Sequence, residues 1–317
     1  MQTPKVSIII LTYNQDAFIE RAIQSALDQT YENFEIIISN NGSTDNTVKI
    51  IESFLPNKQI IFQNYLTNES PNLRQNQAIE ASRGEFISWL YGDDYYLHNK
   101  IEIQVNSFDN LDQSYGVVYG PGYSEDASTN KKILSSSLSY SGFCLDIFLI
   151  KWLKEGNINP ISPLVRRSCY DSCRPSTSIF TEGEVLYLHI AFSYQFFYVN
   201  EPLVVMTDHE SNFGKQIERN LETHEKSIFR LIKENNLSKK TKKLAYYHLA
   251  ERKIIDSWHC FRSNKNIAWG QKNLKDAFNI SRMGCMQNKY FFLSLITLFL
   301  PTKIRYLINY LLPRRSF

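Results

Sequence analysis

The stretch VSIIILTYNQDAFIERAIQSALDQTYENFEIIISNN, residues 6–41, decides the fold of this 317-residue chain. It begins with a continuous apolar, β-branched run from Val6 to Leu11, which is typical of a parallel strand buried on both faces. Apolar residues then recur at helical spacing from Phe18 to Leu27, and a second buried run covers residues 34–38. The stretch therefore predicts strand, helix and strand, which is one βαβ unit of a parallel sheet.

The same alternation continues beyond residue 41. GSTDNTVKIIESF, residues 42–54, predicts a helix in which Ser43 or Thr44 accepts a hydrogen bond from free backbone N–H groups. Residues 59–62 and 85–90 predict two more strands, with a helix over 76–81 between them. The predicted fold class is therefore α/β: a mostly parallel, Rossmann-like sheet flanked by helices. Long charged helical patterns from residue 216 predict a C-terminal helical extension over 216–289.

Composition narrows the classes of function. Hydrophobic residues make up 43% of the chain, enough for one α/β core plus an extension. A net charge of only +3, without a basic and aromatic stripe in the first half, argues against nucleic acid as a partner. Five scattered cysteines and an N-terminus unlike a signal peptide favour a cytoplasmic location. No stretch reaches the roughly 20 apolar residues that a spanning helix needs.

Three polar clusters follow predicted strands. They are TYN at residues 12–14, NNGS at 40–43 and GDD at 92–94. In open α/β sheets, ligands bind beyond the carboxyl ends of the strands, where such clusters come together. The sequence therefore predicts a ligand site at this edge of the sheet.

Two adjacent carboxylates, Asp93 and Asp94, end the apolar stretch WLYGDD, residues 89–94. Neighbouring carboxylates in an apolar setting repel each other and lose hydration, and a divalent cation relieves both costs. Mg²⁺ and Mn²⁺ prefer oxygen ligands, commonly one or two carboxylates completed by substrate phosphates. The pair thus predicts a metal–diphosphate site, in which the cation neutralises charge on a departing nucleoside diphosphate. The alternative is a solvated turn that caps the next helix.

In three ordered blocks the chain resembles the family-2 glycosyltransferases, which have the GT-A fold. The blocks cover residues 6–47, NQAIEASRGEFISWLYGDD at 76–94 and EPLVVMTDHESNFGK at 201–215. The resemblance implies a catalytic domain over 1–215 and a metal-dependent, inverting hexosyltransferase. Such an enzyme moves a sugar from a nucleotide-diphosphate donor to a hydroxyl of a glycan or lipid-linked acceptor, as in bacterial surface polysaccharide (O-antigen or capsule) synthesis.

The resemblance also assigns the donor-binding residues. Thr12 and Tyr13 would line the nucleotide base, Asn40 and Asn41 would lie beside base and ribose, and Arg74 would lie near the diphosphate. The family usually has Asp at one or both of positions 40 and 41. Asn keeps the size but removes the charge, and its amide both donates and accepts hydrogen bonds. The identity of the base therefore stays open.

Metal and catalytic residues follow from the same resemblance. Asp93 and Asp94 correspond to the ribose and metal carboxylates, with Asp94 the better candidate for coordinating Mn²⁺ or Mg²⁺, and His209 would approach the metal or diphosphate. An inverting transfer needs a general base for the acceptor hydroxyl. Glu182 and Glu184 are both candidates for that base, and one of them could merely favour a helix N-terminus.

The last segment, residues 290–317, mixes apolar and aromatic residues with Lys303, Arg305, Arg314 and Arg315. It predicts an amphipathic tail in the membrane interface, on the inner face of the cell membrane, with these cations against anionic headgroups. The alternative is a helix packed on the domain or on a partner chain.

Two rival functions stay open. A sugar nucleotidyltransferase should carry a Gly-rich, Lys- or Arg-bearing loop after the first strand, and LTYNQDAF at residues 11–18 has neither. A catalytically degenerate nucleotide-sugar-binding protein is the other rival, because Asn40, Asn41 and Gly183 replace usual acids of the family.

Overall fold

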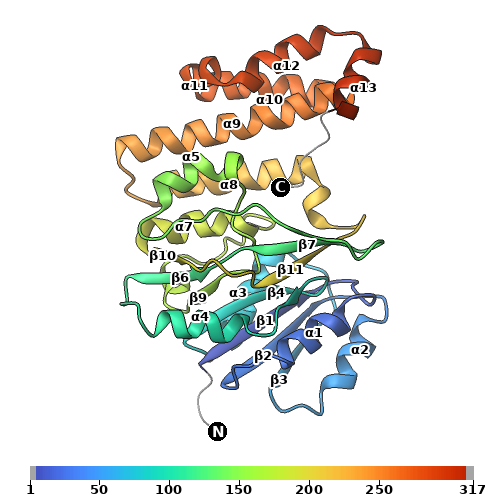
Figure 1. The fold of residues 1–317 in the computed structure, drawn as a ribbon, viewed down its shortest axis with the longest axis vertical. Helices are drawn as coiled ribbons and strands as arrows, with labels where there is room; N and C mark the ends of the chain where they lie inside the picture. Colours follow the sequence, from blue (N-terminus) through green and yellow to red (C-terminus); the bar gives the residue numbers. More distant parts are fainter. Residues whose placement is uncertain (1–4, 312–317) are drawn as a thin grey trace. The chain divides into compact units, whose positions relative to one another are not determined.

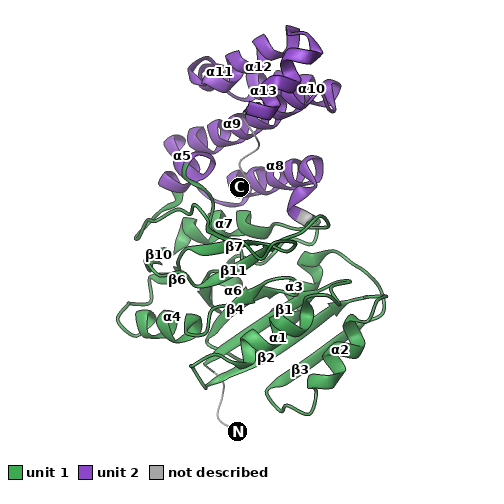
Figure 2. Ribbon diagram, turned by 45° about the vertical axis from the view of Figure 1, so that its right-hand side comes forward, with its two compact units in different colours: residues 1–145, 155–213 green, residues 146–154, 214–317 purple. Residues whose placement is uncertain are grey.

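The computed structural model describes residues 5–311 (Figure 1). They form two compact units (Figure 2). Unit 1 contains the chain up to residue 145 and residues 155–213, and unit 2 contains residues 146–154 and the chain from residue 214. Within the described residues, no helix is both long enough and apolar enough to cross a bilayer.

A seven-stranded sheet in the order β10-β6-β9-β4-β1-β2-β3 forms the centre of unit 1. β1 pairs in parallel with β2 and with β4, and β2 pairs in parallel with β3. β9 alone runs antiparallel, between β4 and β6. The predicted mostly parallel sheet is confirmed. The strands are β1 (Val6–Thr12), β2 (Phe34–Asn41), β3 (Ile60–Tyr65), β4 (Phe86–Tyr91), β6 (Tyr115–Tyr119), β9 (Leu164–Arg166) and β10 (Gln195–Tyr198).

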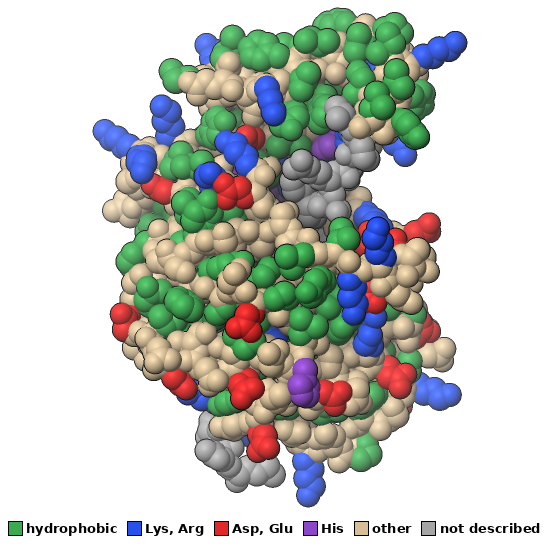
Figure 3. Space-filling model, in the orientation of Figure 1, with side chains coloured by type: hydrophobic (Ala, Val, Ile, Leu, Met, Phe, Trp, Pro, Cys, Tyr) green, Lys and Arg blue, Asp and Glu red, His purple; other side chains and the backbone are tan. Residues whose placement is uncertain are grey.

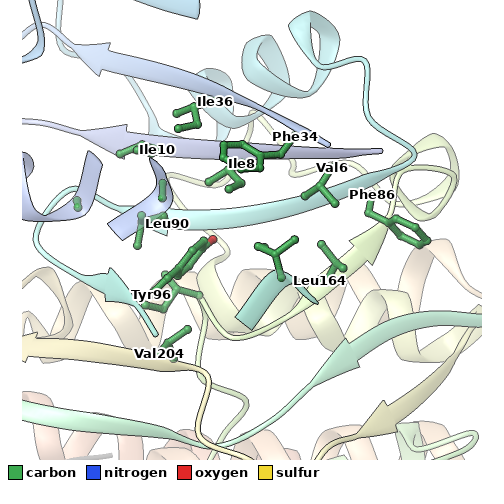
Figure 4. Close-up of a cluster of buried hydrophobic side chains, with 14 of the residues drawn as sticks. Val6, Ile8, Ile10, Phe34, Ile36, Phe86, Leu90, Tyr96, Leu164 and Val204 are labelled. Carbon is green, nitrogen blue, oxygen red and sulfur yellow. The ribbon is translucent and has the colours of Figure 1, made fainter. Parts of the chain in front are cut away.

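Both faces of this sheet are covered. Val6, Ile8 and Ile10 of β1 point into a cluster of buried apolar side chains, which Figure 4 shows in close-up. The same cluster receives apolar residues of α1 (Ile19–Leu27), α2 (Thr47–Phe54) and α4 (Lys100–Phe108). Ile9, which points the other way, is also fully buried, and α3 (Pro71–Ala81) packs against β1 and β2.

A second sheet of four strands, in the order β5-β11-β7-β8, completes unit 1. Its strands are β5 (Tyr95–Tyr96), β7 (Gly122–Asp126), β8 (Lys132–Leu134) and β11 (Val204–Asp208). β5 directly follows the Asp93–Asp94 pair and pairs with β11, which leads into the loop of His209. This pairing brings together segments more than a hundred residues apart. Between them in the chain lie the short helix α6 (Cys169–Ser172), a 3₁₀ turn (Gly183–Val185) and α7 (Leu186–Ser193).

Helices form unit 2, as predicted for the C-terminal extension. α9 is its centre and packs against α8, α10, α11, α12 and α13. Residues 146–154 of α5 (Leu145–Glu155) belong to the same unit, where the Leu149 carbonyl oxygen lies 3.1 Å from His248 Nδ1. The remaining helices are α8 (Ile217–Glu234), α9 (Lys239–Ser263), α10 (Ile267–Ile280), α11 (Arg282–Gln287), α12 (Lys289–Phe299) and α13 (Thr302–Leu311).

One local prediction was wrong, and one predicted helix proved longer than expected. Asp45, not Ser43 or Thr44, serves the start of α2, because its Oδ1 accepts a hydrogen bond from the Thr47 N–H at 3.0 Å. Ser43 and Thr44 turn instead toward Asn14 in the loop after β1. The helix predicted over 76–81 begins earlier, at Pro71.

The tail also differs from its prediction at Arg305. Its guanidinium donates to the carbonyl oxygens of Leu298 and Leu300, at 2.6 and 2.8 Å, and to Asn264 Oδ1 at 3.2 Å. It therefore joins the end of α12 to α13 and does not extend toward a membrane surface. Of the other three predicted cations, Lys303 is exposed, and Arg314 and Arg315 lie outside the described residues.

Candidate active site

The loops after β1 and β2 are joined by Asn14. This residue has a left-handed backbone (φ +52°), a conformation that Asn tolerates better than most residues. Its Oδ1 accepts a hydrogen bond from the Thr44 N–H at 2.8 Å, and its own N–H donates to Ser43 Oγ at 2.9 Å. Beside it, Thr12 is buried and Tyr13 is 45% exposed. Tyr13 is thus the aromatic side chain that this loop offers to a ligand.

Asn40 and Asn41 lie buried at the end of β2, with their amides bonded inside the protein. Asn40 Nδ2 donates to Asn64 Oδ1 at 2.8 Å. Asn41 Nδ2 donates to the Glu69 carbonyl oxygen at 2.8 Å, while its Oδ1 accepts from the Glu69 N–H. A carboxylate could not make the first of these Asn41 bonds, because it has no hydrogen to donate. The need for an amide at position 41 therefore comes from the loop before α3.

Arg74 supports the same loop. Its Nε donates to Asn41 Oδ1 at 2.8 Å, its Nη2 donates to the Thr67 carbonyl oxygen, and its guanidinium lies 3.8 Å from the centre of the Tyr65 ring. The side chain is buried. This placement favours a structural role beneath Asn41 over the predicted contact with a diphosphate. The reason is that the guanidinium nitrogens of Arg74 already donate hydrogen bonds to acceptors within the protein.

Asp94 is buried and turns toward β11. Its Oδ1 accepts a hydrogen bond from the Thr207 N–H at 2.8 Å. Burial and then the charge of Asp93 raise the pKa of Asp94 well above its usual value, against smaller opposing effects of the Thr207 N–H and Arg21. Asp94 therefore joins the end of β4 to the second sheet.

Asp93 faces His209 across the same junction. Its Oδ2 lies 3.1 Å from His209 Nε2, and the two side chains are 14% and 13% exposed. The imidazole stacks on the Phe18 ring, with ring centres 4.8 Å apart, and its Nδ1 lies 2.9 Å from Ser211 Oγ. Asn212 holds the loop through a hydrogen bond from the His209 N–H to its Oδ1. The histidine is thus fixed with one ring nitrogen directed at Asp93.

These two side chains fit a divalent cation. A carboxylate oxygen and an imidazole nitrogen converge, and both belong to partly exposed groups at the carboxyl edge of the sheet. Within residues 5–311, no third His, Cys, Asp or Glu joins them in a cluster. The other ligands would therefore have to come from a bound diphosphate and water, as is usual for Mg²⁺. Asp93 turns an oxygen toward the imidazole, whereas Asp94, which the sequence resemblance preferred for coordination, accepts a hydrogen bond from the Thr207 N–H.

Gly92 permits this arrangement. A Cβ at this position would lie 2.5 Å from Gln15 Oε1 and 2.7 Å from Thr12 Oγ1. Any side chain would therefore push the end of β4 away from the loop after β1. The glycine keeps the carboxylate pair beside Thr12.

The two candidate bases have different surroundings. Glu182 is buried, and its Oε2 accepts a hydrogen bond from the Ser176 N–H at 2.8 Å. Glu184 is partly exposed, and its Oε1 accepts from Asn157 Nδ2 at 3.3 Å. The charge of Glu184 also acts on Tyr91, the last residue of β4. The pKa of Tyr91 is raised by burial and then by Glu184, Asp94 and Asp93. Of the two candidates, Glu184 is the one that solvent can reach.

Sequence reasoning missed Arg21 of α1. Its Nη2 donates to Thr207 Oγ1 at 2.7 Å, its Nη1 lies 3.5 Å from Glu125 Oε2, and its guanidinium lies 4.2 Å from the centre of the Tyr95 ring. An isolated arginine on the polar side of a helix carries no local signal of this role, because all three partners are distant in sequence.

The family model described as Glycosyl transferase family 2 matches residues 7–171, slightly more than half of the chain. Among known proteins, an uncharacterised glycosyltransferase of Rickettsia typhi is 40% identical over 152 residues, which cover 48% of this chain and 47% of that protein. WfaP of Escherichia coli, described as a UDP-Glc:α-D-GlcNAc-diphosphoundecaprenol β-1,3-glucosyltransferase, is 39% identical over 101 residues, or 32% of this chain and 40% of that protein. The chain thus aligns with less than half the length of these relatives.

Solved structures resemble nearly the whole chain. Residues 1–349 of Staphylococcus aureus TarS, in complex with UDP-GlcNAc, superpose with a TM-score of 0.69 at 14% identity, covering 93% of this chain and 89% of that one. The mannosyltransferase PcManGT of Pyrobaculum calidifontis, in complex with GDP-Man and Mn²⁺, gives a TM-score of 0.61 at 12% identity, covering 99% and 89%. This likeness confirms the expected GT-A fold.

Proposed function

The chain belongs to glycosyltransferase family 2, and from that membership we propose a metal-dependent, inverting hexosyltransferase that uses a nucleotide-diphosphate sugar. The observation that carries the proposal is the Asp93–His209 pair at the carboxyl edge of the sheet. Glu184 lies near enough to Tyr91 for its charge to raise the pKa of that residue. The donor fits this edge, where Tyr13 offers a partly exposed ring for the base. The nucleotide ligands in the TarS and PcManGT structures support the class of donor.

The reaction needs one proton transfer and one displacement. The acceptor hydroxyl oxygen attacks the anomeric carbon, the bond from that carbon to the diphosphate oxygen breaks, and the nucleoside diphosphate leaves with the bonding electrons. The Glu184 carboxylate takes the proton from the attacking hydroxyl. Asp93 and His209 would hold Mn²⁺ or Mg²⁺, which when bound neutralises charge on the diphosphate. Attack from the face opposite the leaving group inverts the anomeric carbon.

We propose a glycan or lipid-linked acceptor in the synthesis of a bacterial surface polysaccharide. The support is the printed activity of WfaP, whose acceptor is a diphosphoundecaprenol-linked sugar. With such an acceptor, the enzyme would work in the cytoplasm at the inner face of the cell membrane.

A thermal-shift panel tests the proposal. Nucleoside diphosphates and their sugars are added with and without Mn²⁺, and ligand at about 100 times Kd adds about 2.7 kcal/mol to the stability of a protein that binds it only when folded. We expect one nucleotide series to stabilise the protein in the presence of Mn²⁺, and nucleotide-sugar turnover to accompany it. Asp93→Ala should abolish both effects, whereas Asp171→Ala, which removes an exposed carboxylate elsewhere in unit 1, should change neither.

Two results would count against this function. Metal-dependent nucleotide binding without any turnover would indicate the degenerate binding protein instead. Full activity of Asp93→Ala would show that the carboxylate–imidazole pair is not the metal site.

A further inference from the structure

Helix α12 is apolar on both its buried and its exposed face. Its buried face contains Phe291, Ser294 and Thr297, and the Ser294 hydroxyl has no hydrogen-bond partner. Its exposed face carries large apolar side chains at i, i+3, i+4 and i+7, namely Phe292, Leu295, Ile296 and Phe299. A helix on the surface of a globular unit normally has one apolar stripe, turned inward, and polar residues on its outer face. We therefore expect the exposed stripe to be covered by a lipid bilayer or by the apolar surface of another protein.

Helix α13 also exposes an apolar stripe. None of its residues is buried, and Ile304, Leu307 and Leu311 form an outward apolar stripe at i, i+3 and i+7. Arg305, by contrast, is directed inward to the end of α12. We call the exposed stripes of the two helices the α12–α13 apolar surface. Figure 3 shows hydrophobic side chains gathered over this end of unit 2. Large exposed apolar patches usually mark a protein or membrane contact.

Charge selects between these partners. Residues 262–317 contain ten Lys or Arg and a single acidic residue, Asp276, whereas the first 261 residues contain 25 basic and 31 acidic ones. Lys289 and Lys303, in the first turns of α12 and α13, are exposed, and so is Arg282 of α11. A symmetric contact between two copies would bring these cations together, which like-charge repulsion opposes. An anionic bilayer attracts them.

The aromatic residues of α13 fit the same partner. Tyr306 and Tyr310 are 56% and 83% exposed. Tyrosine rings are enriched at bilayer interfaces, where the ring contacts acyl chains and the hydroxyl stays among the headgroups. With 11 and 10 residues, α12 and α13 are far too short to span a membrane and are of a length suited to lying in its surface.

We propose that the α12–α13 apolar surface docks on an anionic lipid bilayer, with the stripes among the acyl chains and Lys289 and Lys303 at the headgroups. The cations proposed to contact the headgroups differ from those predicted from sequence, because Arg305 donates its hydrogen bonds within unit 2. This inference goes beyond the proposed transfer and does not depend on it, since neither helix contributes a residue to the site.

Vesicle co-sedimentation of the full chain tests the proposal. We expect the protein to bind vesicles of phosphatidylglycerol mixed with phosphatidylcholine, and to bind phosphatidylcholine alone more weakly. Replacing Ile296 and Phe299, 59% and 82% exposed, by Ser should lower partitioning at least about tenfold, because two large apolar side chains no longer enter the bilayer. The matched control replaces Leu66 and Leu134, 92% and 59% exposed in unit 1, by Ser and should bind like the parent.

Further measurements make the outcome decisive. Lys289→Gln with Lys303→Gln should weaken binding to anionic vesicles only and reduce its sensitivity to salt. Circular dichroism verifies that each variant is folded. Failure of the parent protein to bind either kind of vesicle would overturn the proposal, and so would a dimer in solution that Ile296→Ser and Phe299→Ser dissociate. Turnover of a nucleotide sugar with a water-soluble acceptor should be the same for these variants, so a failure of the proposed function is seen separately.

Discussion

At the scale of single residues, Gly183 explains how two nearby glutamates come to differ. Its left-handed backbone (φ +50°) is readily adopted by glycine, and no atom lies within 4 Å of a Cβ placed there. The conformation, not the space, therefore favours glycine. On one side of it Glu182 is buried and accepts from the Ser176 N–H, and on the other Glu184 is partly exposed and accepts from Asn157.

This separation predicts opposite effects of two conservative variants. Glu184→Gln should lower transfer at least about a hundredfold while leaving the nucleotide-induced thermal shift intact, because only the proton acceptor is lost. Glu182→Gln should instead destabilise the protein by about 1–3 kcal/mol, because a buried carboxylate that binds the Ser176 N–H is altered. Transfer assays and thermal unfolding of both variants decide. The reverse pattern would assign the base to Glu182.

Arg21 should act as a positioning residue through Thr207. Replacing it by Met removes the hydrogen bond to Thr207 Oγ1 and the positive charge near Asp94, and we expect the apparent affinity for Mn²⁺ to fall about three- to tenfold. Arg21→Lys should restore part of the loss, because the charge returns without the full set of donors. The Mn²⁺ dependence of nucleotide binding is the measurement. Unchanged Mn²⁺ affinity with a lower melting temperature would reduce Arg21 to a structural role.

The site residues divide according to where their partners lie. The sequence resemblance places Asp93 and His209 in one site, and the structure brings them to 3.1 Å. The inward turns of Asp94, Arg74 and Glu182 depend on Thr207, Asn41 and Ser176, none of which is adjacent in sequence to the residue it binds. A sequence motif identifies a charged side chain, but it does not show which residue will be its hydrogen-bond partner in the folded protein.

At the scale of elements, length and continuity of the apolar pattern decided what could be predicted. β1 and β2 were predicted because both strands are buried along nearly their whole length and so read as unbroken apolar runs. The first turns of α3 were missed because its buried face contains Asn72, Arg74 and Gln75, which hide the helical period. β5 and β8, of two and three residues, are too short to carry a pattern.

The contact between α8 and α9 contains a pair of buried histidines. His248 Nδ1 lies 3.1 Å from the Leu149 carbonyl oxygen and so donates to it, which leaves its Nε2 to accept from His224 Nε2 at 2.9 Å. Burial, with a smaller contribution from Arg252, lowers the pKa of His248 to about 4, and burial followed by His248 lowers the pKa of His224 well below its usual value. The pair is therefore neutral in the folded protein at pH 7.

Unit 2 should consequently lose stability in mild acid. Between the ordinary pKa of 6.5 and about 4, the unfolded chain binds more protons than the folded one, so stability rises with pH across this window and is lost as pH falls through it. For His248 alone we expect roughly 2–3 kcal/mol between pH 7 and pH 4. Urea unfolding at several pH values measures it. His248→Gln should flatten the curve, and the exposed control His98→Gln should not; an equal slope in all three proteins would contradict this account.

At the scale of the whole molecule, the two units are not two successive pieces of chain. Residues 146–154 leave unit 1 and join unit 2 before the chain returns. There Thr241 Oγ1 donates to Asp146 Oδ1 at 2.8 Å, Lys154 lies 3.8 Å from Glu251, and Trp152 packs edge-on against His248. A boundary at residue 215, as drawn from the sequence, leaves α5 on the other side from its partners.

A fragment ending at residue 215 should therefore be unstable on its own. Buried apolar side chains of α5, such as Phe148 and Leu149, would be exposed, and we expect the fragment to aggregate or to lack cooperative unfolding. Co-expression with residues 216–317 should restore a soluble complex. Gel filtration and circular dichroism give the answer, and a monomeric fragment that unfolds cooperatively would show that α5 needs no partner.

The excursion of α5 also limits how such enzymes can be recombined. A chimaera made by a single crossover near residue 214 would pair the α5 of one parent with the C-terminal helices of another. The contact between Leu149 of α5 and His248 of α9 would then join residues from different parents. Two crossovers around residues 145 and 155, made together with the one at 214, would transplant the helical module intact. Evolution faces the same constraint, so substitutions in these eleven residues of α5 should be inherited together with changes in α9.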